Sequence, residues 1–426
     1  MKPLATSLHP EQGCDHVVIS GVGVTAAGLP GREPFWDLLC EGRSATRRIT
    51  RFDPSPYRSQ VAGEVDIDDL PDDVDRGIGL LLAAGREALD DAGDLRVTPE
   101  RIGVSIGTAV GPTLELIRHF RELTGDGVSW DVPHTAATPR AYPGTIPSSF
   151  AAAVAELVGA GGPVATFSSG CTSGIDAVAH GVEMIRRGLA DVVFAGGADA
   201  PIAPISVASF DAIKATSADN GDPSGACKPF DARRDGFVLA EGAAVVVLER
   251  AGLVRARGAH AYAWIGGFGS TSNSYHMTGL TPAGVELARA VDRALADFEP
   301  GPRSIGYINA HGSGTVQNDR HETQAFKLAL GDQATKAMIS SIKSMVGHSL
   351  GAVGAIEIAA CALALDRGFV PPTANLHEND PACDLDYVPL VGRPAELRAA
   401  LSTASGFGGF QSAMVLGAGL PEEVTS

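Results

Sequence analysis

The residues ATFSSGCTSGIDAVAHGVEMIRRG (165–188) form the pattern that decides the fold: a strand, a tight Gly-Ser turn and an Ala/Gly-rich helix. The same order returns in SSIKSMVGHSLGAVGAIEIAACALAL (340–365), with His348 in the place of Cys171. These two residues lie 348 − 171 = 177 positions apart in a chain of 426 residues. The repeat predicts two similar halves that meet at a shared site, although two βα units can also resemble each other by chance.

Short β-rich runs alternate with Ala-rich stretches through the rest of the chain. We expect strands at His16–Ser20, Ile102–Ile106, Val192–Ala195 and Ala244–Leu248, and helices at Gly77–Ala92 and Ile175–Arg187. Each helix is followed by a glycine, Gly93 or Gly188, that can adopt the left-handed cap. This alternation predicts βαβ units in a mainly parallel sheet. The stretch Gly125–Gly144 is expected to be a long loop, and Arg255–His260 a joint between the halves.

The composition excludes several classes of protein. Hydrophobic residues make up 44% of the chain and charged residues 19%, with 52 glycines, which is unlike a disordered chain or a coiled coil. The 33 basic and 50 acidic residues give a net charge of −17. A chain this acidic is a poor candidate for binding nucleic acid or an anionic membrane.

Targeting and redox signals are weak in this sequence. The start, MKPLATSLHPEQG, lacks the apolar stretch of a signal peptide. The Ala-rich segment 351–365 contains Glu357 and is shorter than the roughly 20 apolar residues that span a bilayer. The six cysteines are scattered and form no CxxC pair. This pattern predicts a reduced cytoplasmic protein without a zinc site or a disulfide framework.

Three shorter motifs suggest other functions. The glycines of Gly21-Val-Gly23 follow a strand and resemble a dinucleotide fingerprint, but more glycines and a proline interrupt the helix that should come next. GHSLG (347–351) matches the nucleophile elbow of α/β-hydrolases, yet little chain remains after Ser349 for the other triad residues. His321-Glu322 lacks the second histidine of a zinc motif. Nucleotide binding and hydrolysis stay open as alternatives.

Cys171 has the surroundings of a nucleophile. It lies between Gly170 and Gly174 at the start of a helix, where small neighbours allow a substrate to approach. A helix N-terminus stabilises a thiolate through its dipole and its N–H groups, so we expect a lowered pKa for this thiol. The alternative is a buried cysteine with only a structural role.

Two histidines and a lysine have similarly open surroundings. His311 follows the expected strand Ile305–Ile308 and is followed by glycine, and His348 is flanked by glycine and serine. Together with Lys343 and a glycine-flanked cysteine, they indicate one catalytic site. The turn Ser405–Gly409 offers backbone N–H groups for an oxyanion hole.

These residues resemble the β-ketoacyl synthases, the decarboxylating condensing enzymes of fatty acid and polyketide synthesis, over nearly the whole chain. The order Cys171, His311, Lys343, His348 fits, with spacings of 311 − 171 = 140, 343 − 311 = 32 and 348 − 343 = 5. Several segments are closer to the ketosynthase α-subunits of bacterial type II polyketide synthases: GTAVGPT (107–113), HMTGLTPAG (276–284), NAHGSGTVQNDRHET (309–323), SSIKSMVGHSLGA (340–352) and PPTANLHENDPACDLDYVPL (371–390).

The resemblance implies an α/β fold of the thiolase type, in which two βαβαβαββ halves pack as a five-layer αβαβα sandwich. The N-terminal half, 15–257, would carry the nucleophilic cysteine, and the C-terminal half, 258–418, would carry the His, Lys and His residues. The implied reaction is a decarboxylative Claisen condensation of malonyl-carrier protein with an acyl chain on Cys171. No metal and no bound cofactor is implied, because the substrates arrive on the phosphopantetheine arm of an acyl carrier protein.

The resemblance also implies a role for each site residue. His311 and His348 would stabilise the enolate, and the backbone N–H groups of Cys171 and Phe407 would form the oxyanion hole. Lys343 would order the site by pairing with Glu322. Three further residues match positions that bind the pantetheine arm: Thr278, Ser313 and Thr315.

The implied partners are the carrier protein and a second subunit. Because Cys171 is present, the chain should be the catalytic member of a heterodimer with a chain-length-factor-like paralogue, or else a homodimer. Carrier proteins are acidic, so docking needs a basic patch on this acidic chain. The candidates are Arg47, Arg48, Arg51 and Lys214.

Two alternatives to a polyketide ketosynthase stay open: a fatty-acid elongation enzyme and a non-catalytic scaffold subunit like a chain-length factor. The segment 111–146 follows the family poorly, and in relatives this region lines the acyl pocket and the dimer interface. Chain length, starter unit and reduction state of the product are therefore not predicted.

Overall fold

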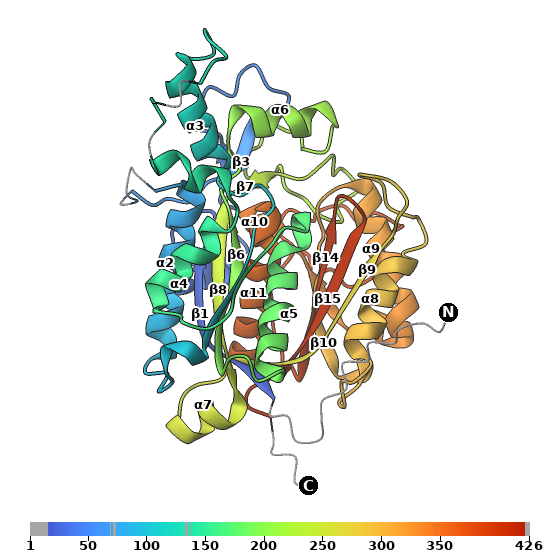
Figure 1. The fold of residues 1–426 in the computed structure, drawn as a ribbon. Coiled ribbons are helices and arrows are strands. Elements are labelled where there is room, and N and C mark those ends of the chain that lie inside the picture. Colours follow the sequence, from blue (N-terminus) through green and yellow to red (C-terminus); the bar gives the residue numbers. More distant parts are fainter. Residues whose placement is uncertain (1–15, 69, 71–73, 133–134, 138, 422–426) are drawn as a thin grey trace, which may run out of the picture.

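The computed structural model describes residues 16–68, 70, 74–132, 135–137 and 139–421 (Figure 1). The starting sequence, Cys14 and residue 15, the first residue of the expected N-terminal half, lie outside them. The helices are α1 Arg32–Glu41, α2 Arg76–Ala92, α3 Thr113–Thr124, α4 Ser149–Val158, α5 Ser173–Arg186, α6 Pro204–Ala212, α7 Ala251–Arg257, α8 Val285–Leu295, α9 Val316–Leu330, α10 Lys343–Val346 and α11 Val353–Arg367. The strands are β1 Val17–Thr25, β2 Thr46–Arg48, β3 Val61–Gly63, β4 Ile102–Gly107, β5 Val164–Phe167, β6 Val192–Asp199, β7 Leu239–Ala240, β8 Gly242–Arg250, β9 Ala263–Ser272, β10 Ile305–Asn309, β11 Met338–Ser340, β12 Phe369–Val370, β13 Arg393–Pro394, β14 Ala399–Gly406 and β15 Phe410–Ala418.

The main sheet has ten strands and repeats one topology twice. Its order is β11-β10-β14-β15-β9-β1-β8-β6-β4-β5, so five strands of the second half are followed by five of the first. The halves join where β1 pairs with β9, at Val18 with Trp264 and Ile19 with Ala263. In chain order, β1, β4, β5, β6 and β8 correspond to β9, β10, β11, β14 and β15. The expected duplication of a βαβαβαββ unit is confirmed.

The halves stack as alternating layers of helices and strands. Figure 1 shows α2 and α4 outside the sheet of the first half, α8 and α9 outside that of the second, and α5 and α11 between the two. The helix α11 is apolar and fully buried over Val353–Leu365 because it is covered on all sides in this middle layer. This arrangement confirms the five-layer αβαβα sandwich.

The sheet is mixed, and the expectation of a mainly parallel sheet is wrong. β4 pairs in parallel with β5 and β6, and β10 with β11 and β14, as helical crossovers require. The last strand of each half returns antiparallel, β8 beside β6 and β15 beside β14. An antiparallel neighbour can be reached without a helix packed on the sheet. The alternation of strands and helices in the sequence therefore did not predict these two antiparallel strands.

The expected helices form with small shifts at their ends. The expected helix Gly77–Ala92 is α2, which begins one residue earlier, after Asp75 caps it by accepting the N–H groups of Gly77 and Ile78. The expected helix at 175–187 is α5. Both following glycines adopt positive φ, 72° at Gly93 and 69° at Gly188.

The dinucleotide-like glycines serve the packing of α2 on β1. A Cβ atom at Gly23 would lie 1.9 Å from the carbonyl oxygen of Ala84, and one at Gly21 would be similarly close to the same helix. The N–H groups after these glycines donate to the carboxylates of Asp91 and Glu87, at 2.9 and 2.8 Å. Carboxylates therefore occupy the backbone donors that a pyrophosphate would need.

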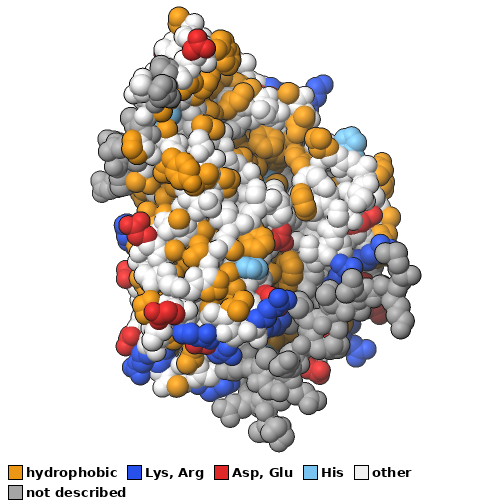
Figure 2. All heavy atoms as spheres, in the orientation of Figure 1, with side chains coloured by type: hydrophobic (Ala, Val, Ile, Leu, Met, Phe, Trp, Pro, Cys, Tyr) orange, Lys and Arg blue, Asp and Glu red, His pale blue; other side chains and the backbone are white. Residues whose placement is uncertain are grey.

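The segment 111–146 contains α3 and then two short 3₁₀ turns, Pro139–Ala141 and Pro143–Thr145. Between α3 and the first of these turns, the described residues form no helix or strand, as expected for the loop Gly125–Gly144. Residues 133–134 and 138 are not among the described residues. Val128 and Trp130 are exposed in this segment. Figure 2 shows hydrophobic side chains gathered in the upper part of the face that it draws, over α3 and α6.

Within the described residues, no helix is long and apolar enough to cross a membrane.

Candidate active site

The ends of strands and the starts of helices bring the candidate residues together. Cys171 lies in the 3₁₀ turn Gly170–Thr172 between β5 and α5, His311 follows β10, and His348 precedes the 3₁₀ turn Leu350–Ala352 that starts α11. All three line one pocket. The pocket is lined by Cys171, Phe210, Phe237, Thr278, Leu280, His311, Ser313, Thr315, Gln317, Asn318, His348, Leu350, Ser405, Gly406 and Phe407. None of these belongs to the segment 111–146.

Cys171 is a half-buried residue that lines the pocket, and its thiol accepts a hydrogen bond from the N–H of Phe407. Burial raises the pKa of Cys171 to about 11, and the charge of Lys343 and the Phe407 N–H only partly oppose this. The expectation of a lowered thiol pKa is therefore wrong. The helix start is present, but removal of water from the thiolate outweighs its favourable dipole.

The two imidazoles both line the pocket and contact each other edge to face, with ring centroids 5.2 Å apart and planes at 81°. Nδ1 of His348 accepts the N–H of Leu350 at 3.1 Å, so the ring proton of a neutral His348 lies on Nε2. Burial, with the Lys343 charge, lowers the pKa of both histidines well below the usual value. Both rings are therefore neutral, and each has one N–H to donate.

Lys343 forms a buried ion pair, but with a different partner from the expected one. Its Nζ contacts a carboxylate oxygen of Glu357 on α11 and donates to the carbonyl oxygen of His311 at 2.5 Å. Both charged side chains are fully buried. The expected pairing of Lys343 with Glu322 is wrong, because α11, in the layer between the sheets, brings Glu357 against the lysine.

Glu322, on α9, holds the backbone on which His311 is carried. Its carboxylate accepts the N–H groups of His311 and Gly312, at 2.7 and 2.8 Å, and the hydroxyl of Thr403 at 2.6 Å. Burial raises the pKa of Glu322 to about 7, while these donors oppose the rise. Its contribution to the site is to fix the turn after β10.

The three expected pantetheine-binding residues all line the pocket. Ser313 and Thr315 have hydroxyls 3.0 Å apart, and Thr315 caps α9 by accepting the N–H of Asn318. Thr278 lies on a different segment, and its N–H donates to Nδ1 of His276 at 3.1 Å. The pocket thus presents hydroxyl groups on both sides of its approach.

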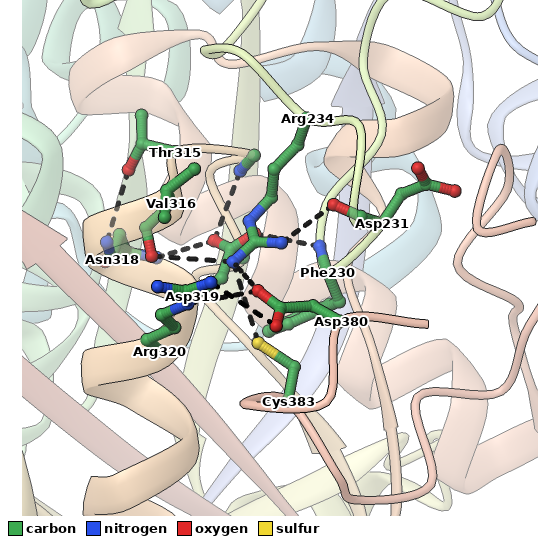
Figure 3. Close-up of polar contacts among 12 residues, drawn as sticks. Phe230, Asp231, Arg234, Thr315, Val316, Asn318, Asp319, Arg320, Asp380 and Cys383 are labelled. Atoms are coloured by element: carbon green, nitrogen blue, oxygen red, sulfur yellow. Dashed lines mark hydrogen bonds and ion pairs between the residues drawn. The ribbon is translucent and has the colours of Figure 1, made fainter. Parts of the chain in front are cut away.

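A buried network holds the Ser313–Thr315 segment from behind. Arg234 pairs with Asp319, Nε to Oδ2 at 3.0 Å, and with Asp380, Nη2 to Oδ2 at 2.9 Å. Asp319 in turn accepts the N–H of Gly314 at 3.3 Å. Figure 3 shows the guanidinium of Arg234 between the two carboxylates, beside the start of α9. The network fixes the pocket wall relative to the loop that carries Arg234.

The four candidate docking residues differ in how free their charges are. Arg47 pairs with two carboxylates at 3.1 and 2.5 Å, and Arg51 lies 3.7 Å from a carboxylate oxygen of Glu241. Arg48 donates to a neighbouring carboxamide. Lys214 is exposed directly after α6, whose Phe210 lines the pocket. In the part of the chain that the structure describes, no ion pair is seen for Arg48 or Lys214.

Several residues of the site were missed from the sequence. Phe237 packs edge-on against His348, with centroids 5.1 Å apart. Glu357 had a visible signal, as the one acidic residue in the apolar stretch Val353–Leu365 of α11. Asp199, at the end of β6, is fully buried and had none. No cluster of three or more metal-ligating side chains occurs among the described residues, so the motif at His321 has no metal-binding context there.

Comparisons with known proteins show the family of the chain. Residues 15–252 match the family model of the β-ketoacyl synthase N-terminal domain, and residues 262–377 match the C-terminal domain. The chain is 55% identical over 410 residues to the tetracenomycin polyketide synthase ketoacyl synthase alpha subunit of Streptomyces glaucescens, covering 94% of this chain and 96% of that one. It is 36% identical to the 3-oxoacyl-[acyl-carrier-protein] synthase 2 of Vibrio harveyi, covering 94% and 97%.

Solved structures share the fold over almost the whole chain. One is a type II polyketide synthase acyl carrier protein in complex with its ketosynthase bound to the hexaketide, with a TM-score of 0.90, 36% identity, and coverage of 95% of this chain and 100% of that chain. Another is the ishigamide ketosynthase/chain length factor, with a TM-score of 0.86, 31% identity, and coverage of 95% and 99%.

Proposed function

The chain belongs to the β-ketoacyl synthase family of condensing acyltransferases, and from that premise we propose that it extends polyketide chains on an acyl carrier protein in a type II system. One observation carries the proposal. A single pocket contains a thiol, two neutral imidazoles and two backbone donors, which are the groups that acyl transfer and enolate formation need. The 55% identity to a polyketide α-subunit, against 36% to a fatty-acid-type synthase, favours polyketides.

The first step transfers the acyl chain to Cys171. The sulfur attacks the thioester of the acyl carrier protein, and the bond from the acyl carbon to the pantetheine sulfur breaks. The thiol proton ends on the departing pantetheine, so the exchange needs no net base. A protonated resting thiol agrees with the raised pKa of about 11.

The second step releases CO₂ from malonyl-carrier protein. The electron pair of the broken bond passes into an enolate, whose oxygen accepts hydrogen bonds from His311 and His348. A neutral imidazole donates without first losing a proton, and Nε2 of His348 carries the needed hydrogen because Nδ1 is already occupied.

The third step forms the carbon–carbon bond. The enolate carbon attacks the acyl carbonyl on Cys171, and the N–H groups of Cys171 and Phe407 hold the developing oxyanion. Loss of one such donor typically costs about 3 kcal/mol of barrier. Collapse of the tetrahedral intermediate expels the Cys171 thiolate, which the nearby charge of Lys343 stabilises until it is protonated.

The remaining residues of the site hold His311 in place and bind the pantetheine arm. Two side chains fix the backbone of His311. Glu322 accepts its N–H, and Lys343, which pairs with Glu357, donates to its carbonyl oxygen. Thr278, Ser313 and Thr315 bind the pantetheine arm by hydrogen bonds from their hydroxyls.

The partners follow from the same reading. The substrates are carried by an acidic acyl carrier protein, and Lys214 and Arg48 form the basic contact because the charges of Arg47 and Arg51 are paired within the chain. The second subunit is a chain-length-factor-like paralogue, with a homodimer as the alternative. We place the reaction in the cytoplasm, consistent with the scattered cysteines.

The test is co-expression with the genomically adjacent carrier protein and ketosynthase-like gene, followed by mass spectrometry of the carrier-bound products. We expect chains longer than the starter by several two-carbon β-keto units, and none from the C171A variant. A single extension would contradict the polyketide assignment and leave the condensing reaction intact. No extension with all partners present would overturn the proposal.

A further inference from the structure

Asp199 ends strand β6 beneath the pocket and is not among the residues that line it. Its carboxylate is fully buried and accepts four hydrogen bonds. Oδ1 accepts the hydroxyl of Thr108 at 2.6 Å and the N–H of Val110 at 3.1 Å, and Oδ2 accepts the N–H groups of Ala109 and Gly351 at 2.8 and 2.7 Å. Three of these donors come from the loop after β4, and the fourth comes from the turn that starts α11.

The turn at Gly351 is the one that orients His348. Leu350, the residue before Gly351, has φ of 49°, a left-handed conformation that costs a non-glycine residue about 1–2 kcal/mol. The N–H of this same residue donates to Nδ1 of His348 at 3.1 Å. The tautomer and ring orientation of His348 therefore depend on a strained residue that its surroundings must hold in place.

Asp199 supplies that support. Its bond to Gly351 fixes the peptide between Leu350 and Gly351 on its C-terminal side, and a Cβ atom at Gly351 would lie 2.6 Å from Oδ2 and 2.4 Å from the backbone nitrogen of Ala109. The carboxylate and the loop thus fill the space into which the turn would relax. On the N-terminal side the backbone of His348 is tied by its N–H to the carbonyl of Val238 at 2.7 Å.

We propose that Asp199 is a positioning residue for the decarboxylation step, which holds the Leu350–Gly351 turn so that His348 keeps its proton on Nε2 and points it into the pocket. The proposal rests on the proposed enolate role of His348. Asp199 does not line the pocket, and its effect on His348 passes through the turn. Its charge also contributes to the raised pKa of Cys171, so its removal should not slow the transfer of an acyl group to that thiol, a step that does not use the His348 N–H.

The test is Asp199→Asn, assayed separately for CO₂ release from malonyl-carrier protein and for self-acylation of Cys171. The amide has the size of the carboxylate but cannot accept from all four donors. We expect CO₂ release to fall about tenfold to a hundredfold, as for small misplacements of a catalytic group, and self-acylation to change less than about twofold. Asp75→Asn, at a buried helix-capping carboxylate, is the matched control and should change neither rate.

A double mutant separates positioning from general damage. If Asp199 acts through His348, D199N should lower CO₂ release less than about twofold further in the H348Q background. An equal effect in both backgrounds, or a parallel loss of self-acylation, would overturn the proposal. If H348Q alone leaves CO₂ release unchanged, the enolate role fails, and with it the proposed function of His348.

Thr108→Val provides a milder version of the test should D199N not fold. It removes one donor to Oδ1 and leaves the carboxylate in place. We expect CO₂ release to fall about threefold relative to self-acylation, by partial loss of one hydrogen bond's support. An unchanged ratio of the two rates in T108V would count against the positioning role.

Discussion

Two 3₁₀ turns of the molecule, Gly170–Thr172 and Leu350–Ala352, start the two central helices and face the same pocket. They are offset by 350 − 170 = 180 positions, and so are the helix starts, 353 − 173 = 180. Cys171 therefore corresponds in structure to Gly351, whereas the sequence repeat aligned it with His348. The proposed nucleophile of one half is matched by a glycine in the other.

The strands that end beside these turns differ in a complementary way. β6 ends at Asp199, whose Oδ2 lies 2.7 Å from the nitrogen of Gly351. β14 ends at Gly406, where a Cβ atom would lie 3.4 Å from the nitrogen of Cys171. In the second turn the N–H of Gly351 donates to the carboxylate of Asp199. Beside the first turn, the corresponding strand end carries Gly406 and therefore no carboxylate. This difference agrees with the proposal that only the Cys171 turn binds the acyl group, because the N–H of Gly351 already donates to a carboxylate.

Among the substitutions that test this contrast between the two turns, replacement of Cys171 should lower condensation the most. In Cys171→Ala both turns carry a small residue, and no acyl-enzyme can form. We expect condensation to fall at least about a thousandfold, while CO₂ release from malonyl-carrier protein continues because the histidines are intact. Mass spectrometry of the protein should show no acyl adduct. Cys40→Ala, at a half-buried cysteine on α1, is the control, and a comparable loss there would contradict the assignment.

A carboxylate at the end of β14 should close the first turn as Asp199 closes the second. Gly406→Asp places an acceptor beside the N–H of Cys171, which then no longer stabilises the oxyanion. We expect condensation to fall about a hundredfold or more, in line with the loss of one oxyanion donor. CO₂ release should fall less, since it does not use that N–H. The measurement is the ratio of the two rates.

The control for that substitution is Gly406→Ala. It adds the same Cβ atom, 3.3 Å from the carbonyl oxygen of Ser169, without the negative charge. We expect a loss within about tenfold, because neighbours must shift by only a few tenths of an ångström. If G406A lowers condensation as much as G406D does, the effect is steric. The difference between the two strand ends would then not explain why the acyl group binds at the Cys171 turn.

Local patterns were enough to predict that three candidate residues share a pocket, but they did not predict the contacts between residues far apart in the chain. Cys171, His311 and His348 could be identified because glycines beside them mark open turns between a strand and a helix. The partner of Lys343 could not, because which carboxylate reaches a buried lysine depends on how the layers stack. Asp199 is 152 residues from Gly351, and nothing near it in the sequence indicates that it holds a turn of the other half.

The third prediction concerns the thiol, whose environment differs most from its sequence-based expectation. Because burial raises the pKa of Cys171 to about 11, the thiolate fraction should grow through the whole accessible range of pH. We expect alkylation by iodoacetamide to speed up about tenfold per pH unit from about pH 7 to about pH 9.5. Peptide mapping of the modified cysteine gives the rate. A plateau near neutral pH would instead indicate a thiolate stabilised by the helix start.

The smallest expected effect is that of pH on CO₂ release, which we compare with the effect of pH on the stability of the protein. The pKa values of His311 and His348 are lowered well below 6.5, so both rings stay neutral in the folded protein when the pH falls to about 6. CO₂ release should therefore show no step near pH 6.5 that belongs to either imidazole, and any step near pH 7 is assigned to the carboxyl groups of Glu322 and Glu357, whose pKa burial raises to about 7. In the unfolded chain the same histidines take up protons below about pH 6.5, so their contribution to stability is present above that pH and declines below it. The contribution of the two histidines to the thermal midpoint, measured against variants with Gln at these positions, should thus fall with decreasing pH without a matching step in the rate. A rate that follows the imidazole titration near pH 6.5 would show that one ring is exposed to solvent in the working enzyme.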